Sequence, residues 1–391
     1  MKIGIVLSNP PAYSETFFVN KIKFLEDSGY EVFVFVDKFS SNRNEKYIEG
    51  YSQGNGFIED LKRKFTVSLR LLNSPFKSMQ LFHRNRKDGF SLRQNLISLF
   101  SSVHILAFEL DWLQFGFATM VMNRENVART IGAKMAVSIR GYDIAIYPLK
   151  FPNCYELLWR RIDKLHYISD DLLALAIGNG FDLNKSHMKI TPAIDVEKFK
   201  YVEHNQNSHL KITTVGRLNW KKGLEYTIEA LSYLKTAGIQ FEYTIIGEGG
   251  DFERLKFAAY QFDIFENVKF IGKKRQDEII DILKSTDIYI QYSIQEGFGN
   301  SVLEAQAMGC ICIVSDAEGL GENVLNGLTG FVVNKRNPEL LFEKIKEVIH
   351  LDGEAKLKMI ENGVARLKRE FNLELQKQKF IDFYQNENLH S

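Results

Sequence analysis

The chain has 391 residues, of which 45% are hydrophobic and 25% are charged, and its formal net charge at pH 7 is +1. This size fits two domains of about 150–200 residues each, and the near-neutral charge gives no whole-molecule field that would favour nucleic acid as a partner. Three cysteines without CxxC spacing (Cys154, Cys310 and Cys312) argue against disulfides and a zinc site and favour the cytoplasm, and without a secretion signal or a long apolar run we expect no membrane span.

The chain opens with the pattern of a parallel α/β fold. Residues 2–7 (KIGIVL) predict a buried strand, a helix is expected to run to about residue 27, and residues 30–36 (YEVFVFV) predict the second strand. Ser14 and Glu15 stand just before the helix and are candidates for contacting a sugar or an acceptor. The alternative is that they cap the helix and complement its dipole.

A basic region follows. Residues 37–56 are polar and predict a loop, and residues 57–100 combine helical periodicity with interleaved aromatic and basic side chains. Amphipathic basic helices can lie on an anionic membrane surface, and the alternative is a pair of ordinary helices with a solvated basic face. The basic residues of this segment are Lys62, Arg63, Lys64, Arg70, Lys77, Arg84, Arg86, Lys87 and Arg93.

The rest of the first domain reads as further strands and helices, with one polar motif at a strand end. Arg140 and Asp143 follow a predicted strand, at the edge of the sheet where α/β proteins bind ligands. Arg140 stays protonated, so it can donate hydrogen bonds to a sugar or a phosphate but cannot act as a base. Asp143 could contact an acceptor or simply pair with Arg140. The predicted strands are 103–108, 133–139, 164–169 and 187–191, with residues 111–116 following the first of them, a helix to about 131 and another at 170–179.

The strand pattern restarts after Asp195, where we place the domain boundary, with a polar linker at 204–209. A strand at 210–215 ends in Gly216-Arg217, and Lys222 lies just before a helix. A strand at 241–246 ends in a Gly-rich turn, in which Gly247 and Glu248 suit nucleotide contact, although such a turn alone is a weak signal. A short strand at 267–271 and a helix at 277–285 complete this part.

Residues 294–315 (IQEGFGNSVLEAQAMGCICIVS) are the most informative stretch. They predict the end of a strand at 287–293, a turn at 297–299, a helix capped by Asn300 or Ser301 that runs to residue 308, and a buried strand at 311–314. A helix that begins at the carboxyl end of a strand offers unpaired amide N–H groups to an anion.

Two carboxylates, Glu296 and Glu304, flank this turn with seven residues between them. Each carboxylate can accept two hydroxyl hydrogen bonds, so the pair suits ribose or sugar diols. Ser301 and Glu304 equally spell a capping box, in which Glu304 would close back on the start of the helix.

The stretch with Glu296 and Glu304, its Glu-Gly-Phe-Gly opening and its Leu-Glu-Ala run resemble the signature of retaining GT-B glycosyltransferases of glycosyltransferase family 4. The resemblance implies that Glu304 binds the nucleotide ribose and that Glu296 contacts the donor sugar. Gly216-Arg217 and Lys222-Gly223 resemble the Gly-Arg and Lys-Gly pair of this family, which implies that both cations hold the donor diphosphate and stabilise the leaving group. Each cation alone could equally be a surface residue.

Other motifs are similar to this family with departures. Arg140-Gly141-Tyr142-Asp143 resembles its His-Gly-x-Asp segment, but Arg140 replaces the histidine. Ser14-Glu15-Thr16-Phe17 resembles a subset associated with exopolysaccharide or colanic-acid-type synthesis, and the glycine pair common in the first loop is missing. The implied catalytic residues are Arg217, Lys222, Glu296 and Arg140. The implied nucleotide-binding residues are Glu304, Gly216, Gly299, Asn300, Ser301, Gly247 and Glu248.

The resemblance implies a GT-B fold, in the α/β class, with two facing Rossmann-like doubly wound domains and an interdomain cleft. Residues 1–195 would bind the acceptor, residues 196–370 the nucleotide sugar, and residues 371–391 would cross back to the first domain. The implied reaction moves a sugar from a UDP- or GDP-sugar to a glycan or lipid-linked acceptor, with retained configuration and with neither metal nor cofactor, in bacterial surface polysaccharide synthesis.

Three rival functions remain. A non-catalytic GT-B subunit could bind nucleotide sugar or scaffold a polysaccharide complex, because Arg140 departs from the family motif. A retaining glycoside hydrolase could use Glu296 and Glu304, but Arg217 and Lys222 would then have no role. Sugar phosphorylase or synthase chemistry shares the fold. The sequence has no Asp-x-Asp at a strand end and no histidine cluster with ligand spacing, so no metal site is expected.

Overall fold

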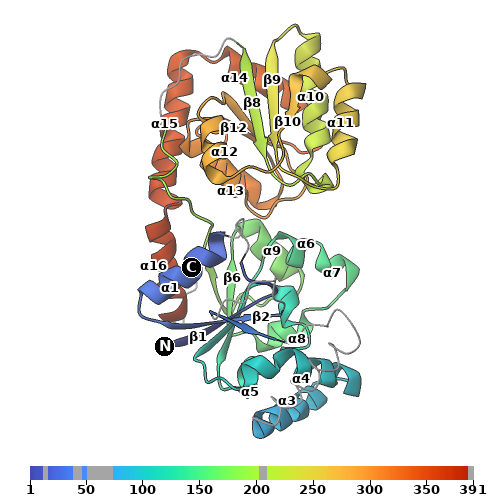
Figure 1. Ribbon diagram of the computed structural model, residues 1–391, viewed down its shortest axis with the longest axis vertical. Helices are drawn as coiled ribbons and strands as arrows, with labels where there is room; N and C mark the ends of the chain where they lie inside the picture. The colour runs from blue at the N-terminus through green and yellow to red at the C-terminus, as the bar shows by residue number, and fades with distance from the viewer. Residues whose placement is uncertain (12–15, 38–45, 51–73, 202–208, 386–391) are drawn as a thin grey trace. The chain divides into compact units, whose positions relative to one another are not determined.

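The computed structural model describes residues 1–11, 16–37, 46–50, 74–201 and 209–385, which form two compact units (Figure 1). Unit 1 consists of the described parts of Met1–Ile190 and Lys377–Ser391, and unit 2 is Thr191–Gln376. Each unit is built on its own parallel β-sheet with helices packed against it, which is the predicted pair of Rossmann-like domains. None of the helices in these ranges is both long enough and apolar enough to cross a bilayer.

The sheet of unit 1 has seven strands in the order β3-β2-β1-β4-β5-β6-β7, and every pair is parallel. The strand order reverses between β1 and β4, which is where ligands bind in doubly wound sheets. The strands are β1 (Lys2–Leu7), β2 (Glu31–Val36), β3 (Tyr47–Glu49), β4 (Trp112–Phe115), β5 (Lys134–Ser138), β6 (Lys164–Tyr167) and β7 (Ser186–Lys189). The short edge strand β3 lies inside the segment that we predicted as a loop.

Two of the helices of unit 1, α3 and α4, lie in the basic region. The helices and the 3₁₀ turn described in this unit are α1 (Thr16–Asp27), α3 (Pro75–Lys87), α4 (Leu92–Leu106), η1 (Ala118–Val121), α5 (Val127–Thr130), α6 (Gly141–Ala145), α7 (Tyr147–Lys150), α8 (Glu156–Arg161) and α9 (Asp170–Gly178). Helix α16 (Leu373–Gln385) begins in unit 2, and its residues from Lys377 onward belong to unit 1. There Phe380 and Phe383 are buried in one cluster with Ile3 of β1 and Phe17 of α1.

One predicted strand of unit 1 is wrong. Residues 103–108 were expected to be extended, but α4 continues to Leu106. Ser91 starts this helix with a capping box, in which its Oγ accepts the N–H of Gln94 at 3.2 Å and its own N–H donates to Gln94 Oε1 at 2.9 Å. Leu99 and Val103 then repeat at helical spacing on the buried face.

The strand that follows lies at 112–115, within the segment that we predicted to come after a strand. The helix that we expected up to residue 131 is divided into η1 and α5. Several predictions lie outside the described residues: the contacts of Ser14 and Glu15, the basic residues Lys62, Arg63, Lys64 and Arg70, and the linker at 204–208.

The sheet of unit 2 has six parallel strands in the order β10-β9-β8-β11-β12-β13. All five strands predicted between residues 210 and 314 are present. The strands are β8 (Leu210–Val215), β9 (Phe241–Ile246), β10 (Val268–Phe270), β11 (Ile288–Gln291), β12 (Ile311–Ser315) and β13 (Phe331–Val333). The order reverses between β8 and β11, so the crevice expected for a ligand lies at the carboxyl ends of these two strands.

Helices and 3₁₀ turns pack on this sheet around a core that includes Ile212, Tyr243, Ile290 and Ile313. They are η2 (Trp220–Lys222), α10 (Leu224–Thr236), α11 (Phe252–Gln261), η3 (Phe265–Asn267), α12 (Gln276–Leu283), α13 (Asn300–Ala307), η4 (Glu318–Asn323), α14 (Pro338–His350) and α15 (Gly353–Glu370).

Candidate functional site

The candidate site lies in unit 2, where the loops after β8, β9 and β11 meet at the switch point. These loops pack backbone against backbone, and at Gly223, Gly247 and Gly249 a side chain would overlap the backbone of a neighbouring loop. Gly247 has φ +147°, and a Cβ there would overlap the carbonyl oxygen of Gly216. Gly223 has φ +59°, and its Cβ would overlap the carbonyl oxygen of Tyr292. The glycines therefore let three loops converge on one point of the sheet edge.

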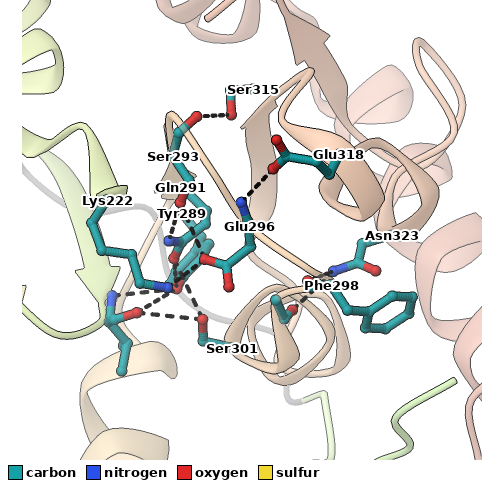
Figure 2. Close-up of polar contacts among 12 residues, drawn as sticks. Lys222, Tyr289, Gln291, Ser293, Glu296, Phe298, Ser301, Ser315, Glu318 and Asn323 are labelled. Carbon is teal, nitrogen blue, oxygen red and sulfur yellow. Dashed lines mark hydrogen bonds and ion pairs between the residues drawn. The ribbon is translucent and has the colours of Figure 1, made fainter. Parts of the chain in front are cut away.

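The ammonium of Lys222 and the carboxylate of Glu296 form an ion pair at this point (Figure 2). The two side chains are 16% and 18% exposed. Ser293 Oγ also donates to Glu296 Oε2, at 3.2 Å. The backbone N–H of Glu296 donates to Glu318 Oε2 at 2.7 Å. Two residues predicted for the donor site are thus in direct contact, with a second carboxylate, Glu318, beside them.

A buried polar network lies beside the Glu296 turn (Figure 2). Gln291 Nε2 donates to Ser293 Oγ at 2.9 Å, and the hydroxyl of Tyr289 donates to Gln291 Oε1 at 3.0 Å. Ser315 Oγ donates to the carbonyl of Ser293 at 2.6 Å. Sequence reasoning missed this network. The available signal was a pair of polar residues, Gln291 and Ser293, at the carboxyl end of an otherwise apolar strand.

Helix α13 starts differently from our prediction. The cap is Gly299, in the left-handed region at φ +97°, and Asn300 is already the first helical residue. Ser301 Oγ lies within hydrogen-bond distance of the carbonyl of Val215 (3.3 Å) and of Gln291 Oε1 (3.4 Å), so it links the helix to β8 and β11. The predicted caps Asn300 and Ser301 are therefore wrong, because the glycine provides the reversal one residue earlier.

Glu304 does not close a capping box. The side-chain amide of Gln276 donates to it, and the charge of Lys198 is close enough to lower its pKa. Lys198 Nζ in turn donates to Gln276 Oε1 at 2.5 Å. Burial outweighs both effects and raises the pKa of Glu304 to about 7. The second carboxylate of the motif therefore lies in a partly desolvated position, held by a side chain from α12.

Three cations share the sheet edge with two carboxylates. Arg217 is exposed in the loop after β8. Lys221 has a lowered pKa, first because it is partly buried and next because the charge of Arg217 is near, while Glu296 and Glu318 oppose the shift. Sequence reasoning singled out Lys222 but missed Lys221 and Glu318. Nothing in the sequence distinguishes Glu318 from a surface residue.

The Gly-rich turn after β9 joins this cluster. The carbonyl of Glu248 accepts the N–H of Leu218 at 2.9 Å, and its side chain is exposed. Gly216 lies against the end of the Lys222 side chain. A Cβ added to Gly216 would be 3.2 Å from Lys222 Cε. The structure therefore brings Gly216, Gly247 and Glu248 together with the ion pair.

In unit 1, Arg140 follows β5 and caps α6. Its guanidinium lies 4.2 Å from the ring centroid of Phe17 and 4.8 Å from that of Phe18. Lys21, which the sequence did not single out, is buried nearby, and burial followed by the charge of Arg140 holds its pKa well below the usual value.

Asp143 is not available to an acceptor in this structure. Its side chain is 2% exposed, and its two oxygens accept the backbone N–H groups of Arg140 (2.7 Å) and Ala118 (2.8 Å). Burial raises its pKa to about 6. These contacts correct our prediction: the carboxylate closes the start of α6 instead of facing a ligand. Across the described ranges, no group of three or more His, Cys, Asp and Glu side chains is placed to hold a metal ion.

Comparison with known proteins gives consistent relatives. Residues 195–366 match the model of the family Glycosyl transferases group 1. The chain is 26% identical to the amylovoran biosynthesis glycosyltransferase AmsK of Erwinia amylovora over 364 residues, 87% of this chain and 89% of AmsK. It is 24% identical over 401 residues to WcaL of Escherichia coli (strain K12), named for colanic acid biosynthesis, with 95% of this chain and 96% of WcaL covered.

Solved structures share the fold along the whole chain. Anabaena HepE in complex with UDP aligns with a TM-score of 0.72 and 15% identity, over 97% of this chain and 98% of HepE. WaaG, a glycosyltransferase involved in lipopolysaccharide biosynthesis, aligns with a TM-score of 0.64 and 15% identity, over 98% of this chain and 100% of WaaG. At this identity the alignments show the fold alone, which is two Rossmann-like domains in one chain.

Proposed function

We propose that the chain is a retaining glycosyltransferase of bacterial surface polysaccharide synthesis, and the match of residues 195–366 to the model of the family Glycosyl transferases group 1 supports this proposal. It would move a sugar from a UDP- or GDP-sugar to an acceptor hydroxyl in the cytoplasm. The relatives AmsK and WcaL, whose names refer to amylovoran and colanic acid biosynthesis, support this assignment. The observation that carries the proposal is the contact between Lys222 and Glu296 at the switch point of unit 2.

The proposed chemistry follows from the charges at that point. Transfer breaks the bond between the anomeric carbon of the sugar and an oxygen of the diphosphate, so negative charge grows on the leaving group. Arg217 and Lys222 would stabilise this charge where it develops, and the contact with Glu296 holds Lys222 there before the substrate arrives. Glu296 would accept hydrogen bonds from the donor sugar. Glu304 would accept two from the ribose.

We further propose that the reaction needs no bound metal. Fixed cations and the amide N–H groups at the start of α13 would provide the charge neutralisation that a divalent cation gives elsewhere. Nucleotide release should then continue in excess EDTA. Retention is tested directly by the anomeric configuration of the product in its proton NMR spectrum, and an inverted product would contradict this part of the proposal.

Unit 1 is the proposed acceptor domain. Arg140 would donate hydrogen bonds to a hydroxyl or a phosphate, and it cannot replace the base that a neutral histidine could be. This departure is also the observation that favours the second candidate, a subunit that binds nucleotide sugar without turning it over.

The acceptor is proposed to be a glycan or a lipid-linked sugar, reached at a membrane surface through α3 and α4. The exposed side of these helices carries large apolar side chains: Phe76 is 76%, Met79 67% and Leu92 63% exposed. Basic side chains lie beside them, and a groove next to α3 is lined by His83, Arg84, Lys87, Arg129 and Arg161, among others. Apolar side chains among cations suit a surface of anionic lipids.

Turnover decides between the two candidates. The purified full chain is incubated with a panel of UDP- and GDP-sugars, and released nucleotide is measured with and without a lipid-linked oligosaccharide fraction as acceptor. A transferase releases nucleotide faster with the acceptor for at least one donor, and Glu304→Ala abolishes most of this release. Binding of UDP or GDP by calorimetry without any release would establish the non-catalytic subunit instead.

A further inference from the structure

We infer that Glu318 is a positioning residue for Glu296, and that the short segment η4 fixes the turn that carries Glu296. The inference rests on the proposed function, since it gives Glu318 a role in donor transfer. Neither the family resemblance nor the comparisons assign a role to this residue. It stands 22 positions after Glu296 in the chain, and its contact arises only through the path of the backbone after β12.

The first support is the geometry of the turn at 296–299, which is held at both ends by η4 (Figure 2). At one end, Glu318 Oε2 accepts the backbone N–H of Glu296 at 2.7 Å. At the other end, Asn323 Nδ2 donates to the carbonyls of Phe298 (3.1 Å) and Gly299 (2.9 Å). The first and last residues of η4 therefore clamp the first and last residues of the turn.

The carboxyl-terminal end of η4 is itself held by hydrogen bonds from α15 and α13. Arg366 of α15 donates to the carbonyls of Glu322 (2.7 Å) and Asn323 (3.0 Å), and Gln306 Nε2 donates to the carbonyl of Asn323 at 2.9 Å. Leu320 is fully buried and packs against Gly299. The segment cannot shift without breaking several buried contacts, so it can hold the turn in one place.

The second support is the backbone of Glu318, which has φ +31°. A residue with a Cβ pays folding free energy to adopt a positive φ, and glycine would occupy this position with less strain. Such strain persists where the surrounding structure imposes it, and it concentrates at functional sites. Glycine would allow the same turn but has no carboxylate. The presence of glutamate at this strained position is therefore explained if the carboxylate is needed.

The third support is electrostatic. The Glu296 side chain is engaged by Lys222 and Ser293 on one side, and its backbone is engaged by the Glu318 carboxylate on the other. A hydrogen bond to an ionised acceptor is stronger than one to a neutral acceptor. Removing the carboxylate should therefore loosen Glu296 and leave the cations that hold the diphosphate in place.

The test compares Glu318→Ala, Glu318→Gln and Glu318→Gly with Arg336→Gly as matched control. Arg336 is exposed on the same unit and has φ +61°, so its replacement relieves backbone strain away from the site. For each full-length variant we would measure kcat and KM with the fastest donor of the panel, the Kd for UDP or GDP, the thermal midpoint, and amide hydrogen exchange of the peptide covering 294–303.

For Glu318→Gly we expect an unchanged or higher thermal midpoint together with a kcat lower by about tenfold or more, since a small misplacement of a reacting group is costly. The Kd for the nucleotide should change less than about threefold, because its ligands stay in place. Glu318→Gln should retain more activity than Glu318→Ala, and exchange over 294–303 should be faster in the alanine and glycine variants. Arg336→Gly should change none of the kinetic values.

Two results would overturn the inference: wild-type kcat and exchange in all three variants, or a loss of activity that only follows a lower thermal midpoint. A wild-type protein that releases no nucleotide from any donor would refute the proposed function separately. The exchange measurement would still decide whether Glu318 holds the Glu296 turn.

Discussion

Lys222 Nζ and Glu296 Oε2 are in contact although 74 positions separate the two residues in the chain. They meet because β8 and β11 are neighbours in the parallel sheet, so the loops that follow them leave from the same edge. The pair keeps both side chains oriented in advance of a substrate, which is the condition for electrostatic stabilisation of a developing charge.

Lys222→Ala should lower kcat/KM by at least about 30-fold, equivalent to about 2 kcal/mol of transition-state stabilisation. The physical reason is the loss of a fixed cation at the leaving group. Steady-state nucleotide release measures the effect. Lys235→Ala is the control, because Lys235 is an exposed lysine of the same unit paired with Asp263. Equal kinetics in both variants would remove Lys222 from the leaving-group site.

The affinity for UDP or GDP should fall as pH decreases below about 7. Burial raises the pKa of Glu304 to about 7, and a ribose that donates two hydroxyl hydrogen bonds binds the ionised carboxylate. Protonation therefore competes with binding, with a limit of about tenfold per pH unit below the pKa. Calorimetry between pH 5.5 and 8.5 measures the trend. Glu304→Gln should bind more weakly with a flatter pH profile, and a wild-type affinity independent of pH would contradict the ribose assignment.

Gly247→Ala should destabilise unit 2 by at least about 2 kcal/mol, because the new Cβ would meet the Gly216 carbonyl and the backbone has φ +147°. Gly250→Ala in the same turn is the control, since no atom lies within 4 Å of its Cβ position. Thermal unfolding followed by circular dichroism compares the two. A midpoint for Gly247→Ala equal to that of the control would show that the loops do not converge as described.

Glu125→Gln should raise the thermal midpoint at pH 8 and have little effect at pH 5. Burial raises the pKa of Glu125 from 4.5 to about 7, so the folded chain binds this proton more tightly than the unfolded chain does. The stability that the proton provides is complete below about pH 4.5 and is lost as pH rises through about 7. A neutral amide avoids this loss, with a gain of at most about 3 kcal/mol, since each pKa unit is worth about 1.4 kcal/mol.

The control for this measurement is Glu109→Gln, because Glu109 is an exposed glutamate of the same unit. Scanning calorimetry at both pH values compares the variants with the wild type. A gain that is the same at pH 5 and pH 8 would show that the substitution acts by packing and not through the proton.

Replacing Arg84, Arg86 and Lys87 by alanine should abolish binding to vesicles of phosphatidylglycerol and phosphatidylcholine. The wild-type binding should weaken between 50 and 300 mM salt, at least about tenfold, because exposed charges are screened within about a nanometre. Co-sedimentation measures it. The matched triple Lys358→Ala, Lys368→Ala and Arg369→Ala removes the same charge from α15. Equal binding by both triples would count against docking through α3.

Most strands of unit 2 could be predicted from the sequence, because they are short, largely apolar runs and glycines in the turns mark where several of them end. Gly216, Lys222 and Glu296 could be placed at one edge from the parallel topology alone. Glu318 could not be placed there. Its contact with Glu296 depends on how η4 folds back after β12, and the spacing of apolar residues does not predict the path of such a segment. The acceptor contact predicted for Asp143 failed for a different reason: a carboxylate five residues after the end of β5 suits a ligand and a helix start equally well.

The error at 103–108 has a similar cause. Val103 and the apolar residues around it fit an extended segment by composition, and only the capping box at Ser91, twelve positions upstream, shows that the helix has already begun. A local window around residue 105 does not contain that information. For α4, this distant starting signal therefore decides the structure more than the local apolar pattern does.

The burial of Phe380 and Phe383 among β1 and α1 has a consequence for biosynthesis. Phe380 and Phe383 follow Ile3 and Phe17 by more than 350 positions in the chain. Until these two aromatic residues emerge from the ribosomal exit tunnel, Ile3 and Phe17 remain without them, so we expect unit 1 to need chaperone protection while unit 2 is being synthesised.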